Sequence, residues 1–221
     1  MDKIINNLKI TDICTATQLK KKFKSHLNEL GYDDLKVSKI PYLLIHCIII
    51  ILEDFLTNSI EHIEKNETNG LYLLKSKYLQ LVFNNYNFVN KYIKKYNKDI
   101  KYGDGIYFNI NKVYSNLESK FGNKLMIENE AKNIINYVLL SVQFDLIKLS
   151  ASYLSFSGKK TFTSNLLSES VNYLIDNEEL LKKITLKMDS DDIRTEIDIN
   201  EVDVIEVDDF CTVEVEEIDV I

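Results

Sequence analysis

The 221-residue chain has few of the residues that make tight turns or covalent cross-links. Six glycines and one proline are too few for a sandwich or barrel that turns about every ten residues. The three cysteines, Cys14, Cys47 and Cys211, are odd in number and form no CxxC pair. They predict a reducing compartment rather than a disulfide framework. Long helices joined by short loops are expected.

Arginine is almost absent, and the charges are unevenly distributed along the chain. The sequence has 26 lysines, one arginine (Arg194) and 34 acidic residues. Residues 188–221 contain 14 of the acidic residues and the arginine, a net charge of −13. Residues 1–187 contain all 26 lysines and 20 acidic residues, a net charge of +6. A mildly basic body therefore carries a strongly acidic tail.

Membrane-spanning runs and enzyme motifs are also missing. The most apolar stretch, residues 40–52, has 13 residues, which is too short to cross a bilayer and predicts a buried core helix. The N-terminal residues have no apolar run of signal-peptide length. His46 and Cys47 lie in the apolar stretch and are interpreted as core residues, and no HExxH, P-loop or GxGxxG motif occurs. We expect no enzyme, no metal, no cofactor, no small-molecule substrate and no membrane partner.

The glycines suggest two units with one plan. Gly31 and Gly70 bracket one long helical pattern, Gly122 and Gly158 bracket another, and each pattern follows a shorter one. Helices are expected at residues 17–30, about 41–65, around 78–82, 87–98, about 113–121, about 130–156, 163–175 and 178–186. The two long helices are apolar around much of their circumference, so we expect each unit to need the other as cover.

Short–long–short helices joined by two loops resemble the histone fold, and motifs of the second unit resemble the 2A-type core histone. In family order these motifs are Phe108 to Val113, Gly122-Asn123, Lys159-Lys160-Thr161 and Ile175 to Leu180. The first unit is similar to the 2B-type histone more loosely, through Val37-Ser38-Lys39 and a lysine-rich fourth helix. The resemblance covers about residues 16–186. It implies an all-α chain of two histone folds paired as a pseudo-heterodimer.

The resemblance also implies a domain organisation and a location. The segments are an N-terminal tail (1–15), a 2B-like histone fold with an extra C-terminal helix (16–98), a linker (99–107), a 2A-like histone fold (108–187) and the acidic C-terminal tail (188–221). Fused doublets of this kind are known from large DNA viruses and some archaea. An intracellular, chromatin-like nucleoprotein is therefore expected, in a virion, a host nucleus or a viral factory.

The function implied by the resemblance is DNA packaging, with duplex DNA bound and bent without sequence readout. The family's motifs place these residues at the DNA: Ser38, Lys39, Lys75, Lys112, Lys120, Lys124, Lys159, Lys160 and Thr161. Glu178 and Glu179 would keep part of a partner-binding acidic patch. The implied partners are double-stranded DNA and a second histone doublet of the other core types, in an octamer-like assembly.

Several alternatives stay open at this stage. Lysine cannot reproduce the planar fork of arginine, so weaker DNA wrapping is expected, and Lys20 to Lys24 are as readily a solvated helix face as a DNA contact. A histone-fold interaction module with little direct DNA binding is the alternative function. The acidic tail could be a solvated charge run, a DNA mimic over the basic loops, or a strand added to a partner through Val202-x-Val204 and Val213-x-Val215.

Overall fold

A computed structural model describes residues 16–37, 40–59, 62–66, 71–102, 106, 109–120 and 125–188, and the statements below concern these residues. They form eight helices and three short strands, so the prediction of a mostly helical fold is confirmed. The first half of the chain forms α1 (Ala16–Glu29), α2 (Ile40–Ser59), α3 (Ser76–Phe83) and α4 (Asn87–Ile93). The second half forms α5 (Ile110–Lys120), α6 (Asn129–Ser157), α7 (Ser164–Leu174) and α8 (Glu178–Met188).

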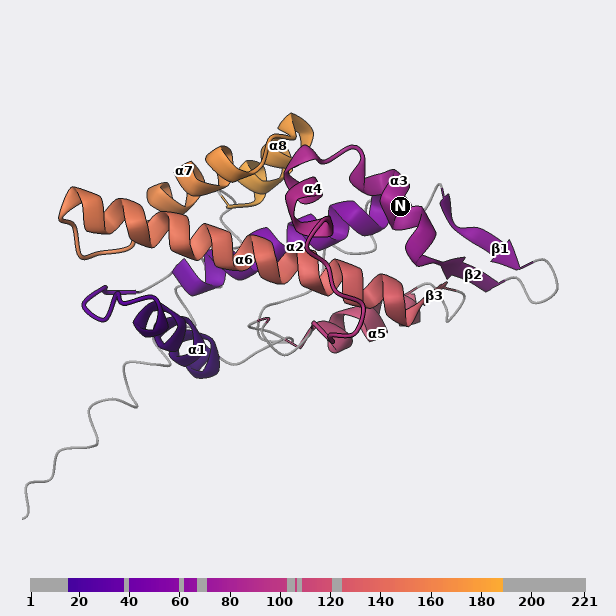
Figure 1. The fold of residues 1–221 in the computed structure, drawn as a ribbon, viewed down its shortest axis with the longest axis horizontal. Helices are drawn as coiled ribbons and strands as arrows, with labels where there is room; N and C mark the ends of the chain where they lie inside the picture. The colour runs from indigo at the N-terminus through magenta and orange to yellow at the C-terminus, as the bar shows by residue number, and fades with distance from the viewer. Residues whose placement is uncertain are drawn as a thin grey trace, which may run out of the picture.

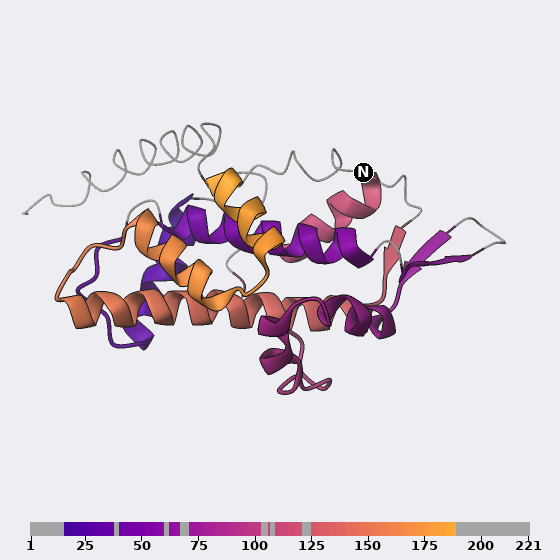
Figure 2. The same ribbon diagram turned by 90° about the horizontal axis from the view of Figure 1, so that it is seen from above.

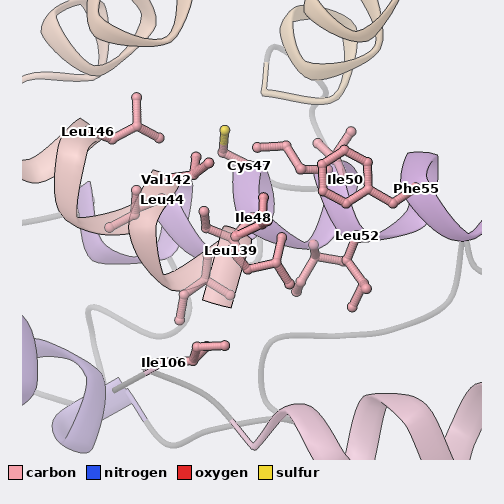
Figure 3. Close-up of a cluster of buried hydrophobic side chains, with 14 of the residues drawn as sticks. Leu44, Cys47, Ile48, Ile50, Leu52, Phe55, Ile106, Leu139, Val142 and Leu146 are labelled. Atoms are coloured by element: carbon pink, nitrogen blue, oxygen red, sulfur yellow. The ribbon is translucent and has the colours of Figure 1, made fainter. Parts of the chain in front are cut away.

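The two long helices, α2 and α6, pack against each other at the centre of the molecule (Figure 1). Residues 41–52 of α2 are all buried, which confirms the core helix predicted for this stretch. In Figure 3, Leu44 and Ile48 of α2 lie next to Val142 and Leu139 of α6. By length and composition alone α2 and α6 could cross a membrane, but most of α2 is buried by its neighbours in the fold.

The last helix of each half packs on the long helix of the other half. α8 packs on α2, whereas α4 packs on α6. α3 and α7 each contact both long helices. Figure 2 shows α4 on the side of α6 that faces away from α2, and α8 lying across α2. Each half thus supplies cover for the apolar central helix of the other half.

A buried carboxylate fastens α8 and the turn before α4 to α2. Asp54 of α2 is only 6% exposed. Its Oδ1 accepts a hydrogen bond from Lys183 Nζ of α8 at 2.7 Å, and its Oδ2 accepts one from the Tyr86 hydroxyl. Burial and the bond to Asp54 raise the pKa of Tyr86, so its hydroxyl stays protonated as a donor. The same carboxylate raises the pKa of Lys183 through its hydrogen bond.

Three short strands meet at one end of the molecule. β1 (Glu64–Asn66) pairs antiparallel with β2 (Leu71–Leu74), and β2 pairs parallel with β3 (Leu125–Ile127), with Tyr72 opposite Leu125. The all-α prediction was wrong here. It missed these strands because β2 and β3 come from different halves of the chain, and helical periodicity carries no signal for such a pairing.

Two expected helices are shorter than the sequence pattern suggested. α2 was expected to reach about residue 65 but ends at Ser59, whose Oγ donates back to the Phe55 carbonyl at 2.6 Å. The residues expected to form the last turn of this helix include Glu64 and Lys65, which belong to β1 instead. α4 was expected to reach residue 98 but ends at Ile93. The chain turns there, and Tyr96 joins Tyr102 and Tyr137 in an aromatic cluster with ring centroids 4.5–5.7 Å apart.

Candidate nucleic-acid interface

At one end of the molecule, the loop before α2 pairs with the loop before α7. Lys36 and Thr161 form a parallel bridge, in which the Lys36 N–H donates to the Lys160 carbonyl at 2.8 Å. The Phe162 N–H donates in turn to the Lys36 carbonyl at 3.1 Å. Phe162 is buried and meets Phe23 of α1 edge-on, with centroids 5.8 Å apart. The bridge and this aromatic contact hold two lysine-bearing loops side by side.

The polar side chains of this loop pair face solvent. Lys36, Lys159, Lys160 and Thr161 are all exposed. Lys160 Nζ lies 3.0 Å from Asp34 Oδ2, and both side chains are largely exposed, at 68% and 80%. An exposed ion pair of this kind contributes at most about 1 kcal/mol. Lys160 can therefore exchange Asp34 for a phosphate at small cost.

The opposite end carries the second loop pair, β2 with β3, where the described side chains include carboxylates as well as a lysine. Lys75 follows β2 directly, at the N-cap position of α3, and is half-buried. The backbone N–H of Ser76 donates to Glu128 Oε2 at 2.8 Å, and the Ser76 hydroxyl donates to Glu130 Oε2 at 3.2 Å. A carboxylate thus already occupies the N-terminus of α3, a position that would otherwise attract a phosphate.

Between the two ends, α1 and α5 lie along one edge of the molecule (Figure 1). Lys112 is exposed in the first turn of α5, and its N–H donates to the side chain of Asn109 at 3.2 Å. Lys21, Lys22 and Lys24 are exposed on α1. In the described part of the chain, none of these four lysines is in an ion pair. They extend the cationic surface from the first loop pair along this edge.

The predicted DNA-contact residues are only partly brought together. Lys159, Lys160 and Thr161 lie in the first loop pair, Lys112 lies on the α1–α5 edge, and Lys75 lies at the second loop pair. Ser38, Lys39 and Lys124 are outside the described residues, and Lys120 is described only as the end of the α5 backbone. Contact between DNA and any of these residues stays a prediction.

Sequence reasoning missed Lys36 and Asp34, although both lie in the loop that bridges to Thr161. Lys36 could have been included among the predicted loop lysines, because it directly precedes the Val37-Ser38-Lys39 motif. Its backbone pairing with a loop more than 120 residues away has no counterpart in the local sequence. Asp34 became relevant only through its ion pair with Lys160.

The two residues of the predicted acidic patch, Glu178 and Glu179, are both exposed. Glu179 and the acidic residue in the middle of α6 are each paired with a lysine. Glu178 and Glu179 lie in the first turn of α8, where carboxylates stabilise the helix N-terminus. Glu179 Oε1 is also 3.4 Å from Lys183 Nζ. The only acidic residue in the middle of α6, Asp145, accepts hydrogen bonds from Lys91 Nζ at 2.8 Å and from the Tyr92 hydroxyl at 2.7 Å. Partner binding by Glu178 and Glu179 stays a prediction.

Outside this surface, the described residues show no arrangement suited to metal binding, since no three His, Cys, Asp or Glu side chains gather in one place. Burial raises the pKa of the Cys47 thiol to about 12, so the thiol stays protonated and unreactive at neutral pH. Comparisons with models of known protein families and with curated proteins find no match. The chemistry that the surface offers is charge neutralisation by exposed lysines.

Proposed function

We propose that the chain is a histone doublet, a 2B-type fold followed by a 2A-type fold, that packages duplex DNA without reading its sequence. One observation carries the proposal. The loop before each long helix pairs in parallel with the loop after the other long helix, as Lys36 with Thr161 and as β3 with β2. This reciprocity is what two histone folds paired head to tail would produce.

The exchange of covering helices supports the same interpretation. α1 to α4 correspond in order and role to α5 to α8: a short helix, a long central one, a short one that contacts both long helices, and a last one placed on the other half. Two equivalent units related by an approximate twofold axis account for this correspondence. A chain of eight unrelated helices gives no reason for it.

The proposed DNA surface runs from the Lys36–Thr161 loop pair along the α1–α5 edge. Lysines there would neutralise phosphates and release condensed counterions, which gives binding that is strongly salt-dependent and independent of sequence. At the second loop pair, Glu128 and Glu130 hold the N-terminus of α3 through Ser76, so a phosphate there would have to displace a carboxylate. Assembly with a second doublet of the other core types would complete a nucleosome-like particle.

The test measures binding of the full chain to two unrelated duplexes over a salt series by fluorescence anisotropy. The two affinities should agree, and the double variant Lys159→Gln with Lys160→Gln should weaken both alike. It should also reduce the salt slope by about 0.9 for each lost phosphate contact. Lys182→Gln, an exposed position on α8 at the opposite edge, is the control and should change neither quantity. Strong preference for one duplex, or an unchanged slope, counts against the proposal.

A second candidate function is a histone-fold interaction module with little direct DNA binding. It is favoured by large apolar side chains that the chain leaves in water: Phe156 is 96% exposed, Tyr173 81% and Leu186 75%. Exposed apolar side chains mark a protein contact where they gather in one contiguous patch. Absence of DNA binding at low salt in the anisotropy experiment would favour this module over the doublet.

A further inference from the structure

The last two turns of α6 leave two large aromatic side chains in water. Tyr153 is 56% exposed and Phe156 is 96% exposed. They are three residues apart, which places them on neighbouring turns of the same side of the helix. Figure 1 and Figure 2 both show this end of α6 projecting beyond the adjacent end of α2. The two rings are therefore accessible to a ligand from solvent.

Exposed lysines lie before and after these rings in the sequence. Residues 146–168 contain no aspartate or glutamate and three lysines, all of them exposed: Lys148, Lys159 and Lys160. The Lys159 N–H donates to the Leu154 carbonyl at 3.2 Å, which folds the lysine-bearing loop back on the last turn of α6. Lys160 pairs with the exposed Asp34, whereas Lys148 and Lys159 are in no ion pair among the described residues. An anionic ligand is therefore favoured at this end of the helix.

The loop before α2 is held against the same side of α6. Lys148, Ser152 and Phe156 follow one another at four-residue intervals, so they lie along one side of the helix. The Tyr32 hydroxyl is 3.2 Å from Ser152 Oγ, which places the half-buried Tyr32 on that side as well. The rings and lysines thus belong to one surface, which we call the α6-end surface: Tyr153, Phe156, Lys148, Lys159 and Lys160.

From this combination we propose that the α6-end surface binds single-stranded DNA, with unpaired bases stacked on Phe156 and Tyr153. A phenyl ring offers a phosphate neither charge nor a hydrogen bond, but it stacks on the face of any base. In a duplex the base faces are covered by their neighbours, and only the base edges are reached from the grooves. The lysines bind the phosphates of the same strand. The rings therefore select unpaired bases, and the lysines hold the strand on the surface.

The inference rests on the proposed function in one respect, because Lys159 and Lys160 would also contact duplex DNA. The two are separable, since the lysines act on both ligands whereas the rings act on the single strand alone. Fluorescence anisotropy of the full chain compares a short oligo-dT strand with a dA·dT duplex of the same length. The double variant Lys159→Gln with Lys160→Gln should weaken both complexes.

Phe156→Ala should weaken binding of the oligo-dT strand about tenfold, because one base loses its stacking partner, and should leave duplex binding unchanged. The matched control is Tyr173→Ala, which removes a ring that is 81% exposed at the far end of α7 and should change neither affinity. A wild-type chain that does not bind the strand, or a Phe156→Ala variant that weakens both ligands or neither, overturns the inference. A wild-type chain that binds the strand but not the duplex contradicts the proposed function and leaves this inference standing.

A fluorescence measurement reports the stacking directly. The chain has no tryptophan, so Phe156→Trp introduces a single one at the α6-end surface. Oligo-dT should quench most of its emission, whereas an abasic strand of the same length, which has the phosphates without the bases, should leave it nearly unchanged. Tyr173→Trp is the control and should respond to neither strand. Equal quenching by the abasic strand or by the duplex, or no quenching by oligo-dT, shows that no unpaired base stacks at this position and overturns the inference.

Discussion

Asp54 has the environment least expected for its residue type. Aspartate is rarely buried without partners, yet here its carboxylate lies inside the fold and bonds Tyr86, Lys183 and Asn58. The desolvation cost of the carboxylate is offset only while these donors stay in place. Asp54 therefore positions α8 and the α3–α4 turn on α2, since Lys183 and Tyr86 come from those two elements.

Asp54→Ala should lower the free energy of unfolding by about 2–4 kcal/mol, because it leaves a buried hydroxyl and a partly buried ammonium group without their acceptor. Asp145→Ala is the matched control. It breaks the Lys91 pair, whose side chains are 48% and 42% exposed, and one bond from the Tyr92 hydroxyl, and should cost about 1–2 kcal/mol. Urea denaturation followed by circular dichroism measures both losses. Equal losses would show that Asp54 has no special structural role.

At the scale of elements, local signals set some helix ends and contacts between the halves set others. α6 ends at Gly158 in the left-handed conformation, with φ of 67°, and α1 is followed by Gly31 with φ of 80°. The hydroxyl of Thr163 caps α7 by accepting from the Leu166 N–H at 3.4 Å. These ends follow from residues within one turn. The end of α2 instead precedes a strand whose partner β2 pairs with β3 from the other half.

Gly158→Ala should destabilise the protein by about 1 kcal/mol, because a Cβ is disfavoured at positive φ. The loss should come from the backbone alone, since an added Cβ has no atom within 4 Å. Gly158→Asn is the control and should recover much of the stability, because asparagine tolerates the left-handed region. The denaturation midpoint reports both variants. An alanine variant as stable as the wild type would contradict this account of the helix end.

The whole molecule has one core to which both halves contribute. α2 is covered by α6, α7 and α8 from the second half, and α6 is covered by α3 and α4 from the first. Separation of the halves would expose the apolar faces of both long helices. The two units of the proposed doublet are therefore expected to fold together, as a pair rather than as two independent domains.

Residues 1–100 and 104–187, expressed separately, should each be poorly folded and should regain helicity when mixed. The physical reason is the apolar surface that each long helix would present to water without its partner. Circular dichroism of each half, and of the equimolar mixture, measures the effect. This prediction would be wrong if each half unfolded cooperatively on its own and the two halves did not associate.

The sequence by itself determined the features that depend on neighbours within a few residues. Helical periodicity located most of the helices, the glycines at 31 and 158 marked two helix ends, and the apolar run at 40–52 identified the buried centre of α2. Lys159 and Lys160 were placed in a loop by Ser157-Gly158, and the structure leaves them exposed. All of these follow from local backbone preference and from the spacing of apolar residues along one helix.

Only the tertiary structure decided what joins residues far apart in the chain. The pairing of β2 with β3, the Lys36–Thr161 bridge and the Asp54–Lys183 bond each connect the first half to the second. No periodicity encodes such contacts, because they depend on how the two long helices cross and on which loops that crossing brings together. The early end of α2, the neutralised N-terminus of α3 and the position of α4 beside the start of α8 are consequences of that crossing.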